Sequence, residues 1–543
     1  MPDPSTTSAT LATTGAPTPW SEWLVDSLHR PIRQTDRERA ALHLIDWLGC
    51  AHLGHTTEVG GVLQRWARQQ APGPVWACGY TGNGANVMNG GNDSSGDIGV
   101  FGSYGGYGGL QAAEAARWNG SLGSCHELDD VHREAVVHPG DTVIPAALAM
   151  AQRQNASAEA LLQAVVRGYE TGILLGLLSG PRHYDHWYST ATTGVFASAM
   201  ACASLLGLNK KQTQHALALA GMQAAGVWQC RLEPGLAKQL ATGHSAQAGL
   251  VAADMAAAGM TGPLSILEGP LGWLQASGGN LDTARAQALL QVPAGSAWRL
   301  HQVSFKPWAA CRHVHPAIEC ALHLHAQGLR PEHMASLRLE TYAVALSFAD
   351  QATPQTPLQG KFSLQHGVAW ALCHGSFGLE ATAPAALVQP DCAALRPRVE
   401  LVCGQAQEQA YPHRFGARLS VQMQDGRTVA HEVQSVLGDP ENPLSPAQVK
   451  AKAQTLLQAS GWESSAAQQL IQICLALPQR DDSGDGLGDG SGDGLGQGQS
   501  LVDGSGQWLG QGLGQGPGQG LGQGPRLEPL WSGLQAKPAA SIK

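Results

Sequence analysis

The sequence predicts a mainly α-helical protein with a second, smaller α+β domain and low-complexity ends. Three observations support this fold class. Helical periodicity recurs from about residue 110 to 274, strand-like alternation is confined to a later segment, and glycine-rich repeats fill the end of the chain. At 543 residues the chain is longer than one ordinary domain, so two folded units are expected.

The first folded stretch is predicted to begin at Trp20. Residues 1–19 are rich in Ser, Thr, Ala and Pro and lack the positive and apolar regions of a signal peptide, so we expect a disordered N-terminus. Two helices are predicted within residues 20–54, with a polar break at 33–39, and a short strand within 72–80. Glycines then crowd residues 82–109. No buried strand precedes them, which favours a mobile loop or insertion over a phosphate-binding loop.

Helices are predicted to follow one another through the rest of the first domain. Apolar residues repeat every three to four positions over 159–178, which is typical of a core-facing helix. The segments 194–208 and 215–227 are rich in small residues, which lets helix axes approach closely. Between them Asn209 and Gln212 form a predicted capping box. One more helix is expected at 251–258, ended by Gly259.

The pattern changes after about residue 292. Apolar and polar residues alternate at 337–341, 419–423 and 429–433, and Asp425-Gly426 predicts a hairpin turn between the last two strands. Helices are predicted at 316–327 and 364–374, so this unit is α+β. Ser445, Pro446 and Gln448 predict the capped start of a helix that reaches residue 457, and a last helix is expected over 464–476.

These elements define the predicted domains. A helical domain is built from residues 20–290 and 442–478, and an α+β domain covers residues 291–441. Residues 479–543 are expected to form a flexible tail, because Gly-Asp and Gly-Gln repeats offer too few bulky side chains to offset the entropy of ordering. The repeats are too irregular for a calcium-binding β-roll.

Composition excludes several partners and indicates a location. The formal net charge is −9 and no run of Lys or Arg occurs, which argues against nucleic acid and against an anionic membrane surface. The uncharged run at 187–209 is too rich in small polar residues for a convincing membrane span. The eleven cysteines form no CxxC pair, so we expect reduced thiols in a cytoplasmic protein.

Residues 127–140 form a dense polar cluster, with four acidic residues, two histidines and an arginine. An apolar run with a proline follows at 141–150, so the cluster is predicted to lie where a loop enters a buried helix. There His138 could face a cavity, and the helix N-terminus could attract an anion. A capping and salt-bridge cluster that only holds the loop is the structural alternative.

Six ordered motifs, spread over roughly residues 20 to 480, resemble the MmgE/PrpD family. They lie at residues 127–140, 190–196, 238–249, 262–269, 306–317 and 361–366. The resemblance implies a helical domain built from both ends of the chain, an α+β lid between them, and a homodimer. It also implies dehydration, decarboxylation or epimerisation of small polycarboxylates without a cofactor.

Such chemistry builds negative charge on carboxylate oxygens, so it needs fixed cations and a separate acid and base. By resemblance, His138 is the acid or base and Lys238 and Lys306 are site lysines. Tyr188 stands where several relatives carry a second site histidine, and a tyrosine can donate a proton. We therefore predict four catalytic residues: His138, Tyr188, Lys238 and Lys306.

The predicted substrate-binding residues include Arg312, whose guanidinium could hold a carboxylate in bidentate fashion. The complete set is Glu127, Asp129, Asp130, Thr190, Arg312, His313 and His366. A carboxylate such as Asp129 or Asp130 would orient His138 and raise its pKa. His313, His315, His323 and His325 fit no standard zinc spacing, so no metal is predicted.

Three functions remain open from the sequence. The leading hypothesis is a cofactor-independent lyase that acts on a small di- or tricarboxylate in the cleft between helical domain and lid. An epimerase could use the same scaffold, because it needs one proton-exchanging group on each side of a carbon. A carboxylate-binding protein without activity is the third. Glu127, Val131, Tyr188 and Ala241 stand where relatives often carry other residues.

Overall fold

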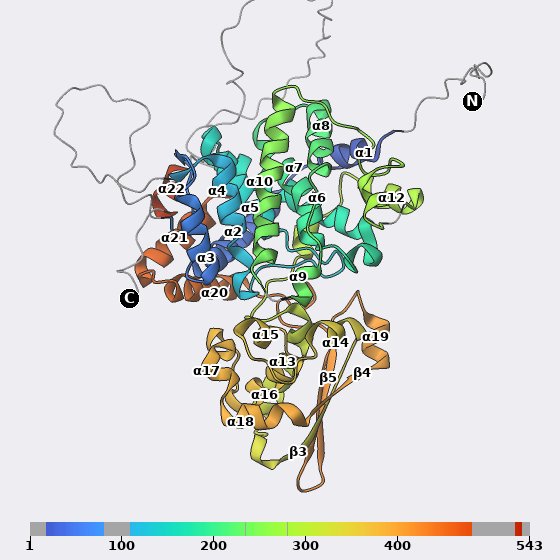
Figure 1. Cartoon of the computed structure of the whole chain (residues 1–543), viewed down its shortest axis with the longest axis vertical. Helices are drawn as coiled ribbons and strands as arrows, with labels where there is room; N and C mark the ends of the chain where they lie inside the picture. The colour runs from blue at the N-terminus through green and yellow to red at the C-terminus, as the bar shows by residue number, and fades with distance from the viewer. Residues whose placement is uncertain (1–17, 81–108, 234, 280, 480–526, 535–543) are drawn as a thin grey trace, which may run out of the picture.

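The computed structural model describes residues 18–80, 109–233, 235–279, 281–479 and 527–534. These residues form a large helical domain and a smaller domain of mixed helices and strands, one below the other in Figure 1. The predicted fold class is therefore confirmed. The blue helix over residues 34–55 lies beside the orange-red helices near the C-terminal end, so both ends of the chain build the large domain.

The large domain is organised around its long central helices, because α6 packs on α7, and α7 on α10 and α5. Its elements are α1 (Trp20–Ser27), α2 (Gln34–His55), α3 (Glu58–Ala67), β1 (Pro72–Gly73), β2 (Gly109–Leu110), α4 (Ala112–Gly120), α5 (Gly140–Gln154), α6 (Ala158–Tyr184), α7 (Ser189–Leu205), α8 (Lys210–Gly221), α9 (Gln229–Leu232), α10 (Ala237–Ala257), α11 (Trp273–Ala276), α12 (Thr283–Leu290), α20 (Pro446–Ala459), α21 (Ser464–Ala476) and α22 (Glu528–Leu534).

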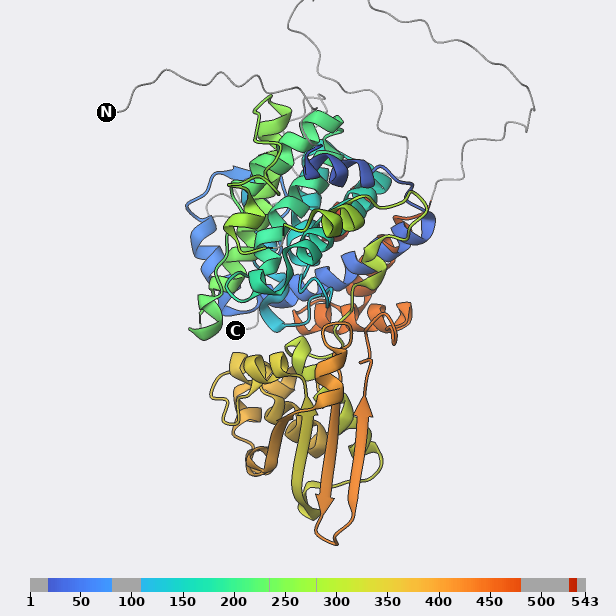
Figure 2. The same cartoon turned by 90° about the vertical axis from the view of Figure 1, so that its right-hand side faces the viewer.

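The smaller domain, the lid, is a sheet with helices packed against it, as Figure 2 shows. Its helices are α13 (His315–Ala326), α14 (Ala343–Ala349), α15 (Pro357–Lys361), α16 (Leu364–His374), α17 (Pro384–Leu387), α18 (Pro390–Leu395) and α19 (Gln405–Ala410). Its strands are β3 (Met334–Thr341), β4 (Val399–Cys403), β5 (Ala417–Met423) and β6 (Thr428–Val433). The strand order is β4-β3-β5-β6, with β3 and β4 parallel and the other neighbours antiparallel.

The two domains have separate hydrophobic cores, and the chain crosses between them twice. Phe305 belongs to the core of the helical domain, whereas Ala310 belongs to the core of the lid. On the way back, the core changes between Val436 and Leu444. The predicted boundary at residue 290 is therefore about fifteen residues too early, because Leu300 and its apolar neighbours pack with the helical domain.

Capping signals and apolar periodicity located several elements well. The helices expected at 364–374 and 464–476 are α16 and α21 with the same bounds, and the hairpin at 425–426 joins β5 to β6. Asn209 and Ser445 both cap their helices with the expected capping boxes. The short strand expected within 72–80 is β1, and β2 pairs with it.

Three helix predictions need correction. The polar residues at 34–39 are the first turns of α2, not a break, because the Asp36 carboxylate accepts a hydrogen bond from the Arg33 amide and caps the helix. The helix expected to reach residue 227 ends at Gly221. The helix expected at 251–258 is only the end of α10, which starts at Ala237. The earlier turns of α10 carry small side chains because α10 packs closely against α4 and α7. For example, a Cβ on Gly243 would lie only 2.4 Å from the Arg117 carbonyl oxygen.

The glycine-rich loop expected at 82–109, apart from Gly109 in β2, and most of the tail expected at 479–543 lie outside the described residues. The tail prediction needs one correction, because residues 528–534 form α22, which packs on α21. Leu527, Leu530 and Leu534 are buried there. Leucines at three- to four-residue spacing give a short amphipathic helix its apolar side.

Among the described residues, one helix is long and apolar enough to cross a membrane. This helix is α6, and 83% of its most apolar window is buried inside the fold. Its place in the core accounts for its composition.

Candidate active site

The polar cluster forms the loop that leads into α5, as the sequence predicted. The loop is fixed by backbone hydrogen bonds, because Val131 exchanges N–H···O bonds with Ser304 (3.0 and 2.8 Å), and His132 pairs with Val137. Glu127 and Val136 have left-handed backbone conformations, with φ of 54° and 50°. Such strain in non-glycine residues persists only where surrounding contacts hold it, and it gathers at functional sites.

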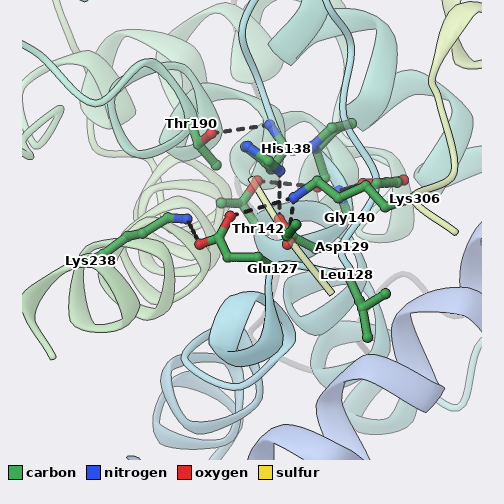
Figure 3. Close-up of polar contacts among 12 residues, drawn as sticks. Glu127, Leu128, Asp129, His138, Gly140, Thr142, Thr190, Lys238 and Lys306 are labelled. Carbon is green, nitrogen blue, oxygen red and sulfur yellow. Dashed lines mark hydrogen bonds and ion pairs between the residues drawn. The ribbon is translucent and has the colours of Figure 1, made fainter. Parts of the chain in front are cut away.

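His138 ends this loop and is held from two sides (Figure 3). Its Nδ1 lies 2.5 Å from Oδ2 of Asp129, and its backbone N–H donates to the Thr190 hydroxyl at 3.0 Å. Burial would raise the pKa of the Asp129 carboxyl, but His138 and Lys306 outweigh it and hold that pKa well below its usual range. Asp129 therefore stays ionised, and as an acceptor it fixes the proton of His138 on Nδ1.

Two lysines approach the acidic residues of the loop from opposite sides (Figure 3). Lys238, in the first turn of α10, forms an ion pair with Glu127. Lys306 lies 3.5 Å from Glu127 and 3.2 Å from Asp129. Burial disfavours the charge of Lys238, but Glu127 and Tyr188 outweigh it and raise its pKa well above the usual value. Burial likewise disfavours the Glu127 anion, yet the two lysines lower the pKa of Glu127.

Tyr188 lies at the start of α7, with its ring centroid 5.8 Å from the Lys238 Nζ. Its backbone N–H donates to the Gly226 carbonyl at 2.9 Å, and the Trp228 N–H donates to the His186 carbonyl at 2.8 Å. Burial raises the pKa of Tyr188, although Lys238 opposes the rise. The phenol therefore keeps its proton at neutral pH and can donate it.

A cavity of about 340 Å³ lies between the helical domain and the lid. This volume is within the usual range for small-molecule sites, about 300–1,000 Å³. The helical domain contributes the loop, Tyr188, α9 and the start of α10, and the lid contributes residues near α14, α15 and Phe415. Glu127, His138, Tyr188, Lys238, Arg312 and His313 are the predicted site residues in its wall.

Arg312 enters the wall from the lid and is held by Asp439, on the second crossing between the domains. Its NH2 lies 2.5 Å from Oδ1 of Asp439, and the NH1 of Arg133 lies 2.9 Å from the other carboxylate oxygen. Arg133 belongs to the loop of the helical domain and also lines the cavity. One buried carboxylate therefore joins two guanidinium groups, one from each domain.

His313 lines the cavity but is uncharged at neutral pH. Burial and the nearby Arg312 lower its pKa to about 3. Its Nδ1 is 2.7 Å from the Tyr342 hydroxyl, and its ring stacks on Phe415 with centroids 5.2 Å apart. It can therefore offer a hydrogen bond to a ligand, but no positive charge.

Asp129, Lys306 and Thr190 support the site from behind the cavity wall. Lys306 was predicted to be catalytic, but its side chain is fully buried between two carboxylates. Its charge balances Glu127 and Asp129, and it lies outside the cavity wall. The Thr190 hydroxyl accepts a hydrogen bond from the backbone N–H of His138.

The structure places two predicted substrate-binding residues elsewhere. Asp130 accepts hydrogen bonds from the Gly140 N–H at 3.0 Å and the Tyr169 hydroxyl at 2.7 Å, so the anion at the N-terminus of α5 is the protein's own side chain. His366 lies inside the lid, where its Nε2 is 2.7 Å from the Ala381 carbonyl and its Nδ1 is 3.3 Å from Arg396. Asp130 and His366 were both predicted from sequence motifs. A motif does not distinguish a side chain that binds substrate from one that stabilises the fold.

Several wall residues were not predicted, among them Arg133, Arg231 and Phe348. Arg133 lies inside the polar cluster, so its charge was a usable signal. Arg231 and Phe348 come from short elements in different domains, and no spacing in the sequence links them. In the described ranges, no group of three or more His, Cys, Asp or Glu side chains is arranged to hold a metal ion.

Comparison with known proteins agrees with this architecture. The MmgE/PrpD N-terminal domain matches residues 91–286, and the MmgE/PrpD C-terminal domain matches residues 308–477. The second match begins within a few residues of the first crossing between the two cores.

Curated relatives are similar at low identity. A cis-aconitate decarboxylase of Aspergillus terreus is 25% identical over 68% of this chain and 79% of its own length. The cis-aconitate decarboxylase-like protein oryM of Aspergillus oryzae is 28% identical over 68% and 80%. The human cis-aconitate decarboxylase is 23% identical over 82% and 89%. With both domain families matched in order over most of its length, this chain belongs to the MmgE/PrpD family.

Proposed function

We propose that this protein is a cofactor-independent lyase that acts on a small di- or tricarboxylate, with His138 as its acid–base group. One observation carries the proposal: a histidine in the cavity wall has its Nδ1 2.5 Å from a buried, ionised aspartate. With Nδ1 protonated and held by Asp129, Nε2 is the nitrogen that exchanges a proton with substrate.

The cations of the wall support a carboxylate substrate. Lys238 and Arg312 line the cavity from opposite domains, and both are held by carboxylates of the protein. A substrate carboxylate that enters can share these cations without bringing a buried charge that lacks a partner. The planar guanidinium group of Arg312 can bind both oxygens of a carboxylate, which the compact ammonium group of a lysine cannot do in the same way.

Two lyase reactions fit these groups. In a decarboxylation, the bond between carbon and a carboxylate breaks, carbon dioxide leaves, and the electron pair left on carbon takes a proton from His138 or Tyr188. In a dehydration, a base removes the proton beside a carboxylate, an acid protonates the leaving hydroxyl, and water and an alkene form. The names of the similar proteins favour decarboxylation. Burial raises the pKa of Tyr188, so its hydroxyl stays protonated at neutral pH and is a weak acid that can protonate only a strongly basic centre such as a carbanion.

The test is turnover of citrate-, aconitate- and succinate-like acids in deuterated water, followed by NMR. Loss of a carboxyl group or of water, with a new or shifted alkene signal, is the expected result. Deuterium in otherwise unchanged substrate would contradict the lyase hypothesis and favour the epimerase. Binding without any exchange or product, for every acid in the panel, would instead indicate a protein that binds carboxylates without activity.

A further inference from the structure

Much of the cavity wall is apolar, although the proposed substrate is a polyanion. Beyond the charged groups, the wall is formed by Tyr184, Trp228, Leu232, Phe348, Leu358 and Phe362. Leu232 and Leu358 have 69% and 38% of their surface exposed, and the aromatic residues are half-buried. These side chains therefore present apolar surface to the cavity.

The apolar surface is continuous with the acid–base groups. Next to Lys238, the Tyr188 ring lies 4.6 Å from the Trp228 ring, between centroids. Trp228 in turn lies 6.3 Å from Phe348, which stacks on Tyr184 at 5.6 Å. The wall thus leads from the catalytic end of the cavity to the lid.

A bare polycarboxylate cannot use such a wall. Carboxylates lose hydration against aromatic and aliphatic side chains and gain no hydrogen bond in return. An alkyl or aryl group gains binding free energy there, because apolar surface of both the ligand and the wall is removed from water. The polar end of the cavity and its aromatic wall therefore select different parts of one molecule.

We propose that the substrate carries an apolar substituent in addition to its carboxylates, and that this substituent lies against the aromatic wall. The inference rests on the proposed function, since it extends the substrate class of the same site. The reacting carboxylate end lies by His138, Lys238 and Arg312, and the substituent points toward Trp228 and Phe348.

A second hollow adjoins the cavity. It has a volume of about 1040 Å³ and shares Trp228, Arg231 and Leu232 with the cavity. The Arg231 guanidinium lies 4.3 Å from the Phe348 ring centroid, so this contact between α9 and α14 marks the boundary of the two spaces.

The test measures binding of succinate and of methyl-, propyl- and hexylsuccinate by calorimetry. These saturated acids are inert probes with the same carboxylate end. The dissociation constant is expected to fall by roughly fourfold for each CH₂ group buried in the wall. A dissociation constant that stays constant or rises with chain length overturns the proposal.

Variants locate the effect. Phe348→Ala is expected to reduce the preference for hexylsuccinate over succinate by on the order of tenfold. Leu358→Asn is a second variant for the case that Phe348→Ala folds poorly. It lies at a partly exposed position that tolerates a polar side chain, and it should reduce the same ratio. Val388→Ala is the matched control, because Val388 is a lid residue, 75% exposed and outside the cavity wall. Equal ratios in all four proteins would contradict an aromatic-wall site.

Turnover separates the two proposals. Alkyl-substituted and unsubstituted aconitate- and citrate-like acids are incubated with the wild-type protein, and carbon dioxide and alkene products are measured. Chain-length-dependent binding without any product would reject the lyase and keep the apolar subsite. Turnover in which the unsubstituted acid has the highest kcat/KM would keep the lyase and reject the subsite.

Discussion

At the residue scale, the site depends on buried charges that hold one another. Asp129 holds His138, and Lys306 balances Asp129. Removing one partner of such a buried pair leaves the other charge buried without a counter-charge. The protein then loses far more stability than when one partner of an exposed pair is removed. The sequence could show that these residue types cluster. It could not show that Lys306 lies behind the wall and Lys238 within it, because that difference depends on how distant parts of the chain pack together.

The first prediction concerns His138. Changing His138→Ala is expected to lower kcat by about two to four orders of magnitude, because the proton-exchanging group is lost while Asp129 keeps Lys306 as a partner. Steady-state kinetics on the acid found by the NMR screen provide the measurement. His413→Ala, at an exposed lid position, is the control and should retain wild-type kcat. Near-normal turnover in His138→Ala would remove His138 from the mechanism.

The second prediction is a pH dependence from Asp141, in the first turn of α5. Burial, with the charges of Asp129 and Asp130, raises the pKa of Asp141 well above its usual value. The unfolded chain releases this proton near pH 4, whereas the folded protein retains it, so stability falls as pH rises from 4 toward the folded pKa. The slope is up to about 1.4 kcal/mol per pH unit.

Replacing Asp141 by Asn removes this term. Denaturant unfolding at several pH values should therefore show Asp141→Asn gaining stability relative to wild type between pH 4 and pH 8, whatever its absolute stability. Parallel curves for the two proteins across that range would mean that Asp141 is ionised in the folded state.

At the scale of elements, the two chain crossings between the domains are bonded to each other. The Phe305 N–H donates to the Gly438 carbonyl at 3.1 Å, and the Ser304 hydroxyl donates to Asp439 at 2.8 Å. Gly438 has a φ of 97°, and a Cβ there would lie 1.9 Å from the Phe305 carbonyl oxygen. Only glycine fits this position.

We therefore expect Gly438→Ala to lower the free energy of unfolding by at least about 2 kcal/mol, because it combines a forbidden φ with a backbone clash. Gly426→Ala is the matched control. Gly426 has a φ of 86° in the β5–β6 turn but open space around its Cβ position, so only the conformational cost of about 1–2 kcal/mol applies. Chemical denaturation of both variants tests the difference, and equal losses would show that the crossing can relax.

The elements that the sequence predicted well are those with a local signal. Capping boxes at Asn209 and Ser445 and a run of apolar residues at 364–374 are local. The start of α10 and the strand β4 were missed, since their positions depend on neighbours distant in the chain. Small residues fill the start of α10 because other helices lie close to it, and a hydrophobic pattern cannot report such an approach.

At the scale of the whole molecule, the returning C-terminal segment supports the site loop. Lys452 of α20 donates to the Leu128 carbonyl at 2.7 Å and lies 2.7 Å from Asp46 of α2. The segment that leaves the lid thus ties the loop to the N-terminal helices. The sequence predicted that both ends share a domain, but not this lysine, because an isolated Lys in a helix usually faces solvent.

The last prediction concerns α22. Ending the chain at Gln479 removes α22 and exposes the side of α21 that it covers, including Leu470. The free energy of unfolding should fall by about 1 kcal/mol or more, because the apolar side of α21 is then exposed to water in the folded protein. Thermal unfolding measures the loss, and kcat should be unchanged, since no residue of α22 lines the cavity. An unchanged melting temperature would contradict stable packing of α22 on α21.

The single carboxylate of Asp439 has a consequence for ligand binding. It holds Arg312 of the lid and Arg133 of the loop, and both arginines also line the cavity. Under the proposed function, a substrate carboxylate at Arg312 shares that guanidinium group with Asp439, which also joins the lid to the loop. Occupancy of the site and the contact between the two domains are then linked thermodynamically, and each alters the other by the same free energy.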